Sequence, residues 1–188
     1  MTARIDTAAC ESHHAAPRGA RATDRTLPLA TVRTLAAGAH VGDLVFIRER
    51  ACAPDAATGA AGAWANRFGI VVDTSGDEPA IAESTAFGWT TLTPLSRFVA
   101  RTDGGRIALA RRVAAASADA QRHVHALAER RIDALLGSRF NLRARRGFCA
   151  QYVAEVLGAG HAATPSALLR SGTLALEFDG IVFDPRQP

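Results

Sequence analysis

The segment Gly147-Phe148-Cys149-Ala150-Gln151-Tyr152-Val153-Ala154-Glu155-Val156-Leu157-Gly158-Ala159-Gly160 decides the predicted fold. Its apolar residues recur at helical spacing, so one face of a short helix is expected to pack against a core. Cys149 falls in the first turn, where free backbone N–H groups and the helix dipole can lower a thiol pKa from about 8.5 to roughly 3.5–7.5. This placement predicts a nucleophile. Simple core packing fits the same pattern, because free cysteine is among the most buried residue types.

The chain before this helix reads mostly as β-structure. Compact apolar or alternating runs, each bounded by charged or turn residues, predict strands over residues 44–47, 68–72, 80–83 and 106–110. A Gly- and Ala-rich stretch over 51–63 predicts an exposed loop, and 93–95 predicts a turn or a one-turn helix.

Two further helices and a hairpin are predicted around the Cys149 segment. Ser117 is a good N-cap for an amphipathic helix that ends at Gly137, and Thr164-Pro165 begins a shorter helix through 169. Asp179-Gly180 lies between two apolar runs, which predicts a β-hairpin. Strands first and helices later indicate the α+β class, with an antiparallel sheet packed against helices.

Length and composition limit the domain organisation, the location and the partners that can be expected. The chain has 188 residues, and residues 1–27 lack an apolar face, so we expect a flexible tail followed by a single domain over 28–188. No signal peptide or membrane span is evident, which predicts a cytoplasmic location, although secretion by a route without a signal stays open. All 22 basic residues are arginine and the net charge is only +4, so no nucleic-acid partner is expected.

The cysteines predict neither a disulfide nor a metal site. Cys10, Cys52 and Cys149 are far apart and form no C-x-x-C pair, so free thiols are expected, with no cofactor. The oligomeric state is open.

Arginines gather just before the Cys149 helix. Such a cluster can be a solvated surface, or its guanidinium groups can bind a carboxylate or phosphate of a substrate. The predicted substrate-binding residues are Arg139, Arg143, Arg145 and Arg146.

An ordered series of short motifs resembles a known family. The series comprises Gly42-Asp43-Leu44-Val45-Phe46, Asn66-Arg67-Phe68-Gly69-Ile70-Val71, Ile81-Ala82-Glu83, Leu136-Gly137 with Phe140-Asn141-Leu142, Phe148-Cys149, and Thr164-Pro165-Ser166. In this order the motifs are similar to the YiiX-like permuted papain-fold amidases, which belong to the broader NlpC-type cysteine hydrolases. The similarity runs from about residue 40 to 172, and it implies a permuted papain-like fold.

The resemblance also implies a catalytic site. Cys149 matches the nucleophile, Glu83 matches the polar member of the triad, and Arg67 stands where the family carries its histidine. An arginine can hold a thiolate by charge but cannot accept its proton. We expect Cys149 to face the strands that carry Arg67 and Glu83 across an open groove.

Two functions of different class follow. The first is a cysteine-dependent hydrolase or acyltransferase that acts on an amide or ester bond, with a peptidoglycan-peptide or lipid-like substrate. The second is a catalytically impaired pseudoenzyme that uses the cleft to bind an anionic ligand. In both cases the partner is a small molecule, a peptide or a lipid.

Overall fold

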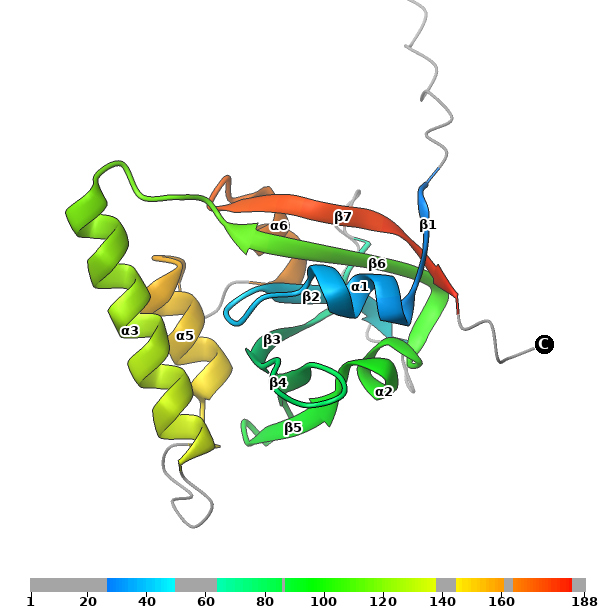
Figure 1. The fold of residues 1–188 in the computed structure, drawn as a ribbon, viewed down its shortest axis with the longest axis horizontal. Helices are drawn as coiled ribbons and strands as arrows, with labels where there is room; N and C mark the ends of the chain where they lie inside the picture. The colour runs from blue at the N-terminus through cyan, green and yellow to red at the C-terminus, as the bar shows by residue number, and fades with distance from the viewer. Residues whose placement is uncertain (1–26, 50–63, 86, 138–144, 161–163, 184–188) are drawn as a thin grey trace, which may run out of the picture.

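The structure is a computed structural model that describes residues 27–49, 64–85, 87–137, 145–160 and 164–183. Within these residues the chain forms one sheet with helices on both faces, as Figure 1 shows. The predicted loop at 51–63, the predicted tail apart from Leu27, and Arg139 and Arg143 lie outside the described residues. The proposed division of the chain at residue 28 stays a prediction.

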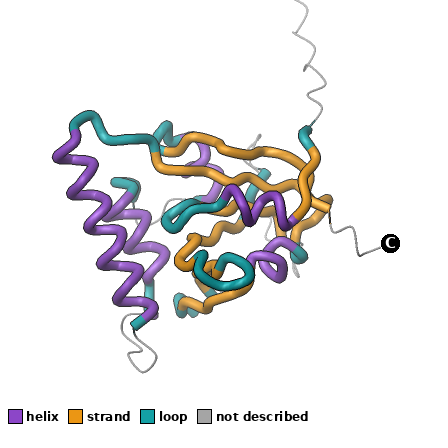
Figure 2. The backbone as a smooth tube through the Cα atoms, in the orientation of Figure 1, coloured by secondary structure: helices purple, strands orange, loops and turns teal. Residues whose placement is uncertain are grey.

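The sheet has seven strands in the order β1-β7-β6-β2-β3-β4-β5. All neighbouring pairs are antiparallel except β1 and β7, which are parallel. Figure 2 shows the strands in orange between the helices. Their bounds are β1 Leu29–Thr31, β2 Leu44–Glu49, β3 Arg67–Asp73, β4 Ala80–Ser84, β5 Thr90–Pro94, β6 Thr102–Arg112 and β7 Leu174–Phe183.

The helices are α1 Val32–Gly38, α2 Leu95–Val99, α3 Ala118–Leu136, α5 Phe148–Val156 and α6 Pro165–Arg170. Two predicted caps are confirmed by their hydrogen bonds. Ser117 Oγ accepts from the Ala120 N–H at 3.2 Å, and Thr164 Oγ1 accepts from the Ala167 N–H at 3.2 Å. No helix in the described ranges has the length and apolar character that a bilayer crossing requires.

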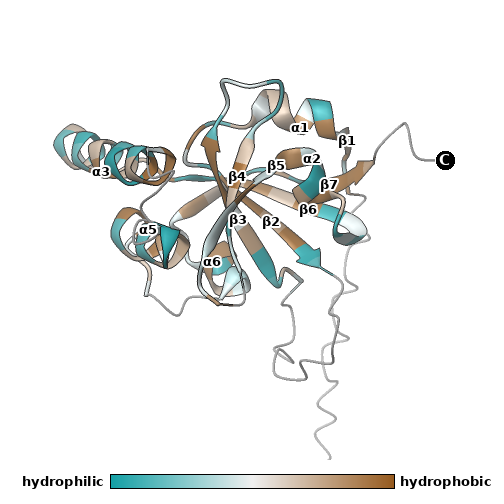
Figure 3. Ribbon diagram, turned by 90° about the horizontal axis from the view of Figure 1, so that it is seen from below, coloured by the Kyte–Doolittle hydropathy of each residue, from teal (hydrophilic) through white to brown (hydrophobic). Residues whose placement is uncertain are grey.

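Two hydrophobic clusters cover the two faces of the sheet, because successive strand residues point to opposite sides. One cluster joins the sheet to α3, α5 and α6, and it contains Cys149 and Ala82. The other joins the sheet to α1 and α2, and it contains Ile81 and Phe98. Figure 3 shows the two groups of helices on opposite sides of the strands. This arrangement confirms the predicted α+β class.

The predicted hairpin at Asp179-Gly180 is wrong, because β7 runs through both residues without a turn. Asp179 accepts two hydrogen bonds from Arg106 on β6, at 3.0 and 2.9 Å. A Cβ on Gly180 would lie 2.3 Å from the Pro28 carbonyl oxygen, so glycine permits the close approach of the segment that leads into β1. The Asp179-Gly180 pair is therefore present because strand packing requires these two residues, and not because the chain turns there.

Candidate active site

Cys149 lies in the first turn of α5, as the sequence predicts. Gly147 precedes the helix with φ of +71°, a conformation that favours glycine. The Gly147 N–H donates to the Gly88 carbonyl at 2.8 Å, and Trp89 and Arg146 form an isolated antiparallel bridge. The connection between β4 and β5 is thereby fastened to the start of α5.

The Cys149 side chain is buried, with only 2% of the residue exposed. Its thiol donates to the Ala82 carbonyl oxygen, with an Sγ–O distance of 3.6 Å. Burial raises the pKa of the Cys149 thiol to about 11, although the hydroxyls of Ser84 and Thr90 act in the opposite direction. The expectation of a lowered thiol pKa is wrong for this structure, because loss of hydration outweighs the effect of the helix start.

Glu83 and Arg67 project from the other face of the sheet. On β4, Ala82 packs with Cys149 while its neighbour Ile81 belongs to the α1 and α2 side, so Glu83 shares the side of Ile81. On β3, Arg67 alternates with Phe68, which packs on the Cys149 side. The expected groove, with the thiol facing both side chains, is therefore not formed.

The structure does bring Arg67 and Glu83 together, within a charged network. The Glu83 carboxylate, 3% exposed, accepts from Arg67 Nε at 3.1 Å and from Arg101 Nη2 at 2.7 Å. Thr93 Oγ1 donates to its other oxygen at 2.6 Å, and Arg67 Nη1 also donates to Glu49 at 2.5 Å. Both carboxylate oxygens of Glu83 are occupied by this network.

The network also sets the ionisation of Glu83. Burial alone would raise its pKa, but the hydrogen bonds from Arg101 and Thr93 and the charges of Arg101 and Arg67 together lower it below the usual value. Glu83 is therefore a carboxylate held by arginines rather than by an imidazole. These bonds give Glu83 a structural role, in which it joins β3, β5 and Arg101 after α2.

No imidazole hydrogen-bonds to Cys149 among the described residues. His40 Nδ1 lies 3.1 Å from the Gly38 carbonyl oxygen, and His125 Nε2 lies 3.3 Å from a Glu129 oxygen. His123 is exposed on α3. Among the residues that the structure describes, Cys149 therefore has no histidine that could act as its general base.

Of the four arginines predicted to bind substrate, two lie in the described residues. Arg145 is half-buried and Arg146 is exposed, directly before α5. They lie at the same end of α5 as Cys149, next to Trp89. Their role in substrate binding stays a prediction.

Sequence reasoning missed Ser84 and Thr90, the polar residues that share the face of Cys149. They are opposite each other in the β4–β5 pair. Thr90 is buried, and its Oγ1 has no nitrogen or oxygen hydrogen-bond partner. The available signal was the period of two, since residues that flank Glu83 in sequence must point to the side opposite to it.

A cavity of about 390 Å³ opens on the same side of the sheet, further along α5. It lies between α3, α5, the end of β6 and the segment 40–43 that precedes β2, and Cys149 does not line it. Tyr152 and Val156, one and two helical turns beyond Cys149, do line it. This cavity could not be predicted from the sequence, because its walls come from four separate parts of the chain.

Across the described ranges, no group of three His, Cys, Asp or Glu side chains lies close enough to hold a metal ion.

Comparison with known proteins gives the family. A family model described as "Permuted papain-like amidase enzyme, YaeF/YiiX, C92 family" matches residues 38–172. Among solved structures, the metalloprotein yiiX from Escherichia coli O157:H7 is similar, with 16% sequence identity and a TM-score of 0.43, over 76% of this chain and 98% of that one. No curated protein matches. Because the family model spans most of the chain, the protein belongs to the YaeF/YiiX family of permuted papain-like amidases.

Proposed function

We propose that this protein is a catalytically impaired member of the amidase family that acts mainly by binding an anionic ligand. The observation that carries the proposal is the state of Cys149, which is buried, bonded to the Ala82 carbonyl and without an imidazole among the described residues. With a pKa of about 11, only about one Cys149 in 10⁴ is a thiolate at pH 7. A cysteine nucleophile reacts as the thiolate, so this environment supports slow chemistry or none.

The positions of Arg67 and Glu83 support the same proposal. In a thiol hydrolase a carboxylate orients the base, and the base takes the proton of the nucleophile. Here Glu83 binds Arg67 and Arg101, which cannot take a proton. Assembly of a triad from these residues would require the network to break and both side chains to cross to the other face.

A cysteine-dependent hydrolase or acyltransferase is the second candidate. Family membership favours it, as do the hydroxyls of Ser84 and Thr90 beside a cysteine at a helix start, which act to lower the pKa of its thiol. In that mechanism Cys149 loses its proton to water and attacks the carbonyl of an amide or ester, while its own N–H helps to hold the oxyanion. The C–N or C–O bond then breaks, the amine or alcohol leaves with a proton from water, and water or an acceptor alcohol or amine takes the acyl group from the thioester. For Arg67 to stabilise the thiolate and Glu83 to position the partner, as the sequence predicts, both side chains would first have to leave the other face of the sheet.

Hydrolysis measurements separate the two candidates. The full chain and its Cys149→Ser variant are assayed with p-nitrophenyl esters and aminoacyl p-nitroanilides, with Cys10→Ser and Cys52→Ser in both proteins to remove the other thiols. Impaired catalysis predicts equal rates for the two proteins within about threefold. A rate that depends on Cys149 by more than about 10²-fold would establish the hydrolase instead.

A further inference from the structure

We infer that the outer edge of β5 binds an extended acidic segment of a partner protein. The inference rests on the proposed binding function and deepens it, because it names the class of ligand and gives the ligand a place beside the start of α5. β5 is the last strand at one end of the sheet, and Figure 1 shows it as the lowest strand. We call residues 87–92 together with Arg145 and Arg146 the β5 docking surface.

The chain itself already pairs with one end of this edge. Trp89 and Arg146 form an isolated antiparallel bridge, and the Gly147 N–H donates to the Gly88 carbonyl at 2.8 Å. Thr90, the first residue of β5, is buried beside this contact. The outer edge of β5 therefore accepts a second strand, and the pairing covers only the end of β5 that lies next to α5.

Further along β5, the backbone of Leu92 faces away from β4. The Thr85 N–H donates to the Trp89 carbonyl at 2.7 Å, so these two facing residues are hydrogen-bonded. Bonded and non-bonded pairs alternate along an antiparallel ladder, and Leu92, opposite Ala82, is three pairs further on, at a non-bonded pair. Its N–H and carbonyl oxygen therefore point to the open edge. Only another extended chain supplies a matching donor and acceptor, so a peptide fits this edge better than other anions.

Large apolar side chains are exposed along the same edge. Phe87 is 84% exposed, Leu92 is 41% exposed and Trp89 is 38% exposed. Aromatic residues and arginine are enriched in protein–protein interfaces, and tryptophan and arginine are frequent among the residues that dominate binding energy. The side chains of an added strand alternate between its two faces, so apolar residues at alternate positions of the partner would pack on this edge.

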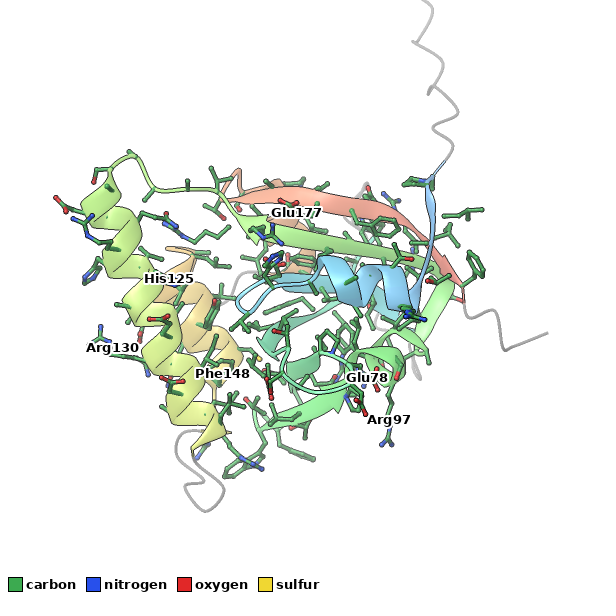
Figure 4. All side chains as sticks on the ribbon, in the orientation of Figure 1. Glu78, Arg97, His125, Arg130, Phe148 and Glu177 are labelled. Atoms are coloured by element: carbon green, nitrogen blue, oxygen red, sulfur yellow. The ribbon has the colours of Figure 1, made fainter. Side chains whose placement is uncertain are left out.

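The charge of the β5 docking surface is positive. Residues 87–94 contain no charged side chain, and the segment before α5 adds Arg145 and Arg146. Neither arginine has an acidic partner among the described residues. Figure 4 marks Glu78, which lies at the opposite end of β5 and accepts a backbone hydrogen bond from the start of α2 at 2.9 Å. Acidic side chains of a bound segment are therefore attracted to the Arg146 end, where carboxylates can accept from guanidinium groups.

Fluorescence anisotropy with a labelled peptide tests the inference. The probe is about nine residues long, with glutamates at both ends of a core of alternating valine and threonine. We expect saturable binding to the full chain in about 150 mM salt. A peptide with lysines in place of the glutamates should bind at least about tenfold more weakly, since hydrogen bonds to charged groups have this magnitude. A peptide with N-methylated core amides should bind at least about threefold more weakly, because it cannot donate to the Leu92 carbonyl.

Two variants locate the site. Arg146→Gln and Trp89→Ala should each weaken binding of the acidic peptide by about fivefold or more, since truncation of a dominant interface residue has at least this effect. Arg130→Gln is the matched control, because Arg130 is exposed on α3 and, within the described residues, bonds only to its own helix. If Trp89→Ala does not fold, as judged by circular dichroism, Arg146→Gln against Arg130→Gln decides the outcome.

No binding of the acidic peptide by the folded chain, equal binding of the lysine or the N-methylated peptide, or equal binding by Arg146→Gln would each overturn the inference. A concentration-dependent dimer in sedimentation velocity that Leu92→Lys dissociates would also overturn it, because a second copy would then occupy the edge. Failure of these tests leaves impaired catalysis at Cys149 standing. Hydrolysis that depends on Cys149, together with the expected peptide binding, overturns the proposed loss of catalysis and leaves the β5 assignment intact.

Discussion

Cys149 and Glu83 lie on opposite faces of strand β4, although the Cys149 thiol bonds to the carbonyl of Ala82, the residue directly before Glu83. Closeness along the backbone therefore does not bring the two side chains together. Glu83 acts on the thiol only through its charge, which disfavours the thiolate. A carboxylate in this position cannot orient a base for Cys149.

The position of an added imidazole tests this geometry. Ser84→His places an imidazole on the face of Cys149, whereas Arg67→His places one on the opposite face. We expect Ser84→His to raise the rate of Cys149 alkylation by iodoacetamide at pH 7 by about tenfold or more, because an imidazolium stabilises a nearby thiolate. Arg67→His should leave the rate unchanged within about twofold. The reverse order of the two variants would show that the assignment of faces is wrong.

Acid should weaken the fold through Glu83. Its pKa is lower in the folded protein than the ordinary value of 4.5, so its contribution is present above that pH and is lost as pH falls through the folded pKa. Glu83→Gln should lower the free energy of unfolding at pH 7 by about 2 kcal/mol, because the half-buried Arg67 and Arg101 lose their buried carboxylate partner and, among the described residues, keep only Glu49 as an acidic partner. Urea unfolding between pH 7 and pH 3 measures both effects.

The loss of stability below pH 4.5 should be smaller in Glu83→Gln than in the parent protein. Arg97→Gln serves as the control, since Arg97 is exposed on α2 outside this network. An equal acid dependence in the parent and in Glu83→Gln would mean that the network does not hold Glu83 ionised.

Alkali should weaken the fold through Cys149. The pKa of the Cys149 thiol in the folded protein is about 11, above the ordinary value of 9.0. The thiol therefore makes its whole contribution to the free energy of unfolding below pH 9, and this contribution is lost as pH rises through 11. The size of this term is on the order of 3 kcal/mol. Cys149→Ala, although less stable at pH 7 because of the cavity it leaves, should lack this part of the decline in urea unfolding from pH 8 to pH 11. Parallel declines in the two proteins would contradict a raised pKa.

The parts of the fold that the sequence predicts are those with strong local signals. Apolar runs predicted the central strands β2 and β3, and the N-caps Ser117 and Thr164 predicted where α3 and α6 begin. Strand β5, Thr90–Pro94, was missed because it is short and polar at an edge of the sheet. Strand β1 and helix α1 were missed because three residues and two turns carry too little periodicity to detect.

The candidate site shows a different limit. The position of Cys149 in the first turn of α5 could be predicted, because helical spacing and the glycines around the helix are local features of the sequence. The direction of the pKa shift of the Cys149 thiol could not be predicted, because burial of the thiol depends on packing against Ala82 and on the face that each strand presents. The structure brings Arg67 and Glu83 together on the face away from Cys149. The second arginine on Glu83, Arg101, could not be predicted, because it follows α2 and has no motif of its own.

Gly180 should be essential for docking of the first strand. A methyl group at this position would meet the Pro28 carbonyl oxygen at 2.3 Å and the Phe178 ring at 2.6 Å. Gly180→Ala should therefore destabilise the protein by about 1–3 kcal/mol, measured by thermal or urea unfolding. In Gly38→Ala the added Cβ meets nothing within 4 Å, so that variant should unfold like the parent or be slightly more stable. Equal stability of the two variants would argue against close packing of Pro28 on β7.

The central claim is that the Cys149 thiol is sealed and not activated. Its most direct test is the pH dependence of iodoacetamide alkylation at Cys149 in the Cys10→Ser, Cys52→Ser background, followed by intact mass under native conditions. The account predicts slow alkylation at pH 7, at least about tenfold slower than a free cysteine peptide, and a rate that still rises above pH 10. A rate that levels off below about pH 8, at or above that of the peptide, would contradict it.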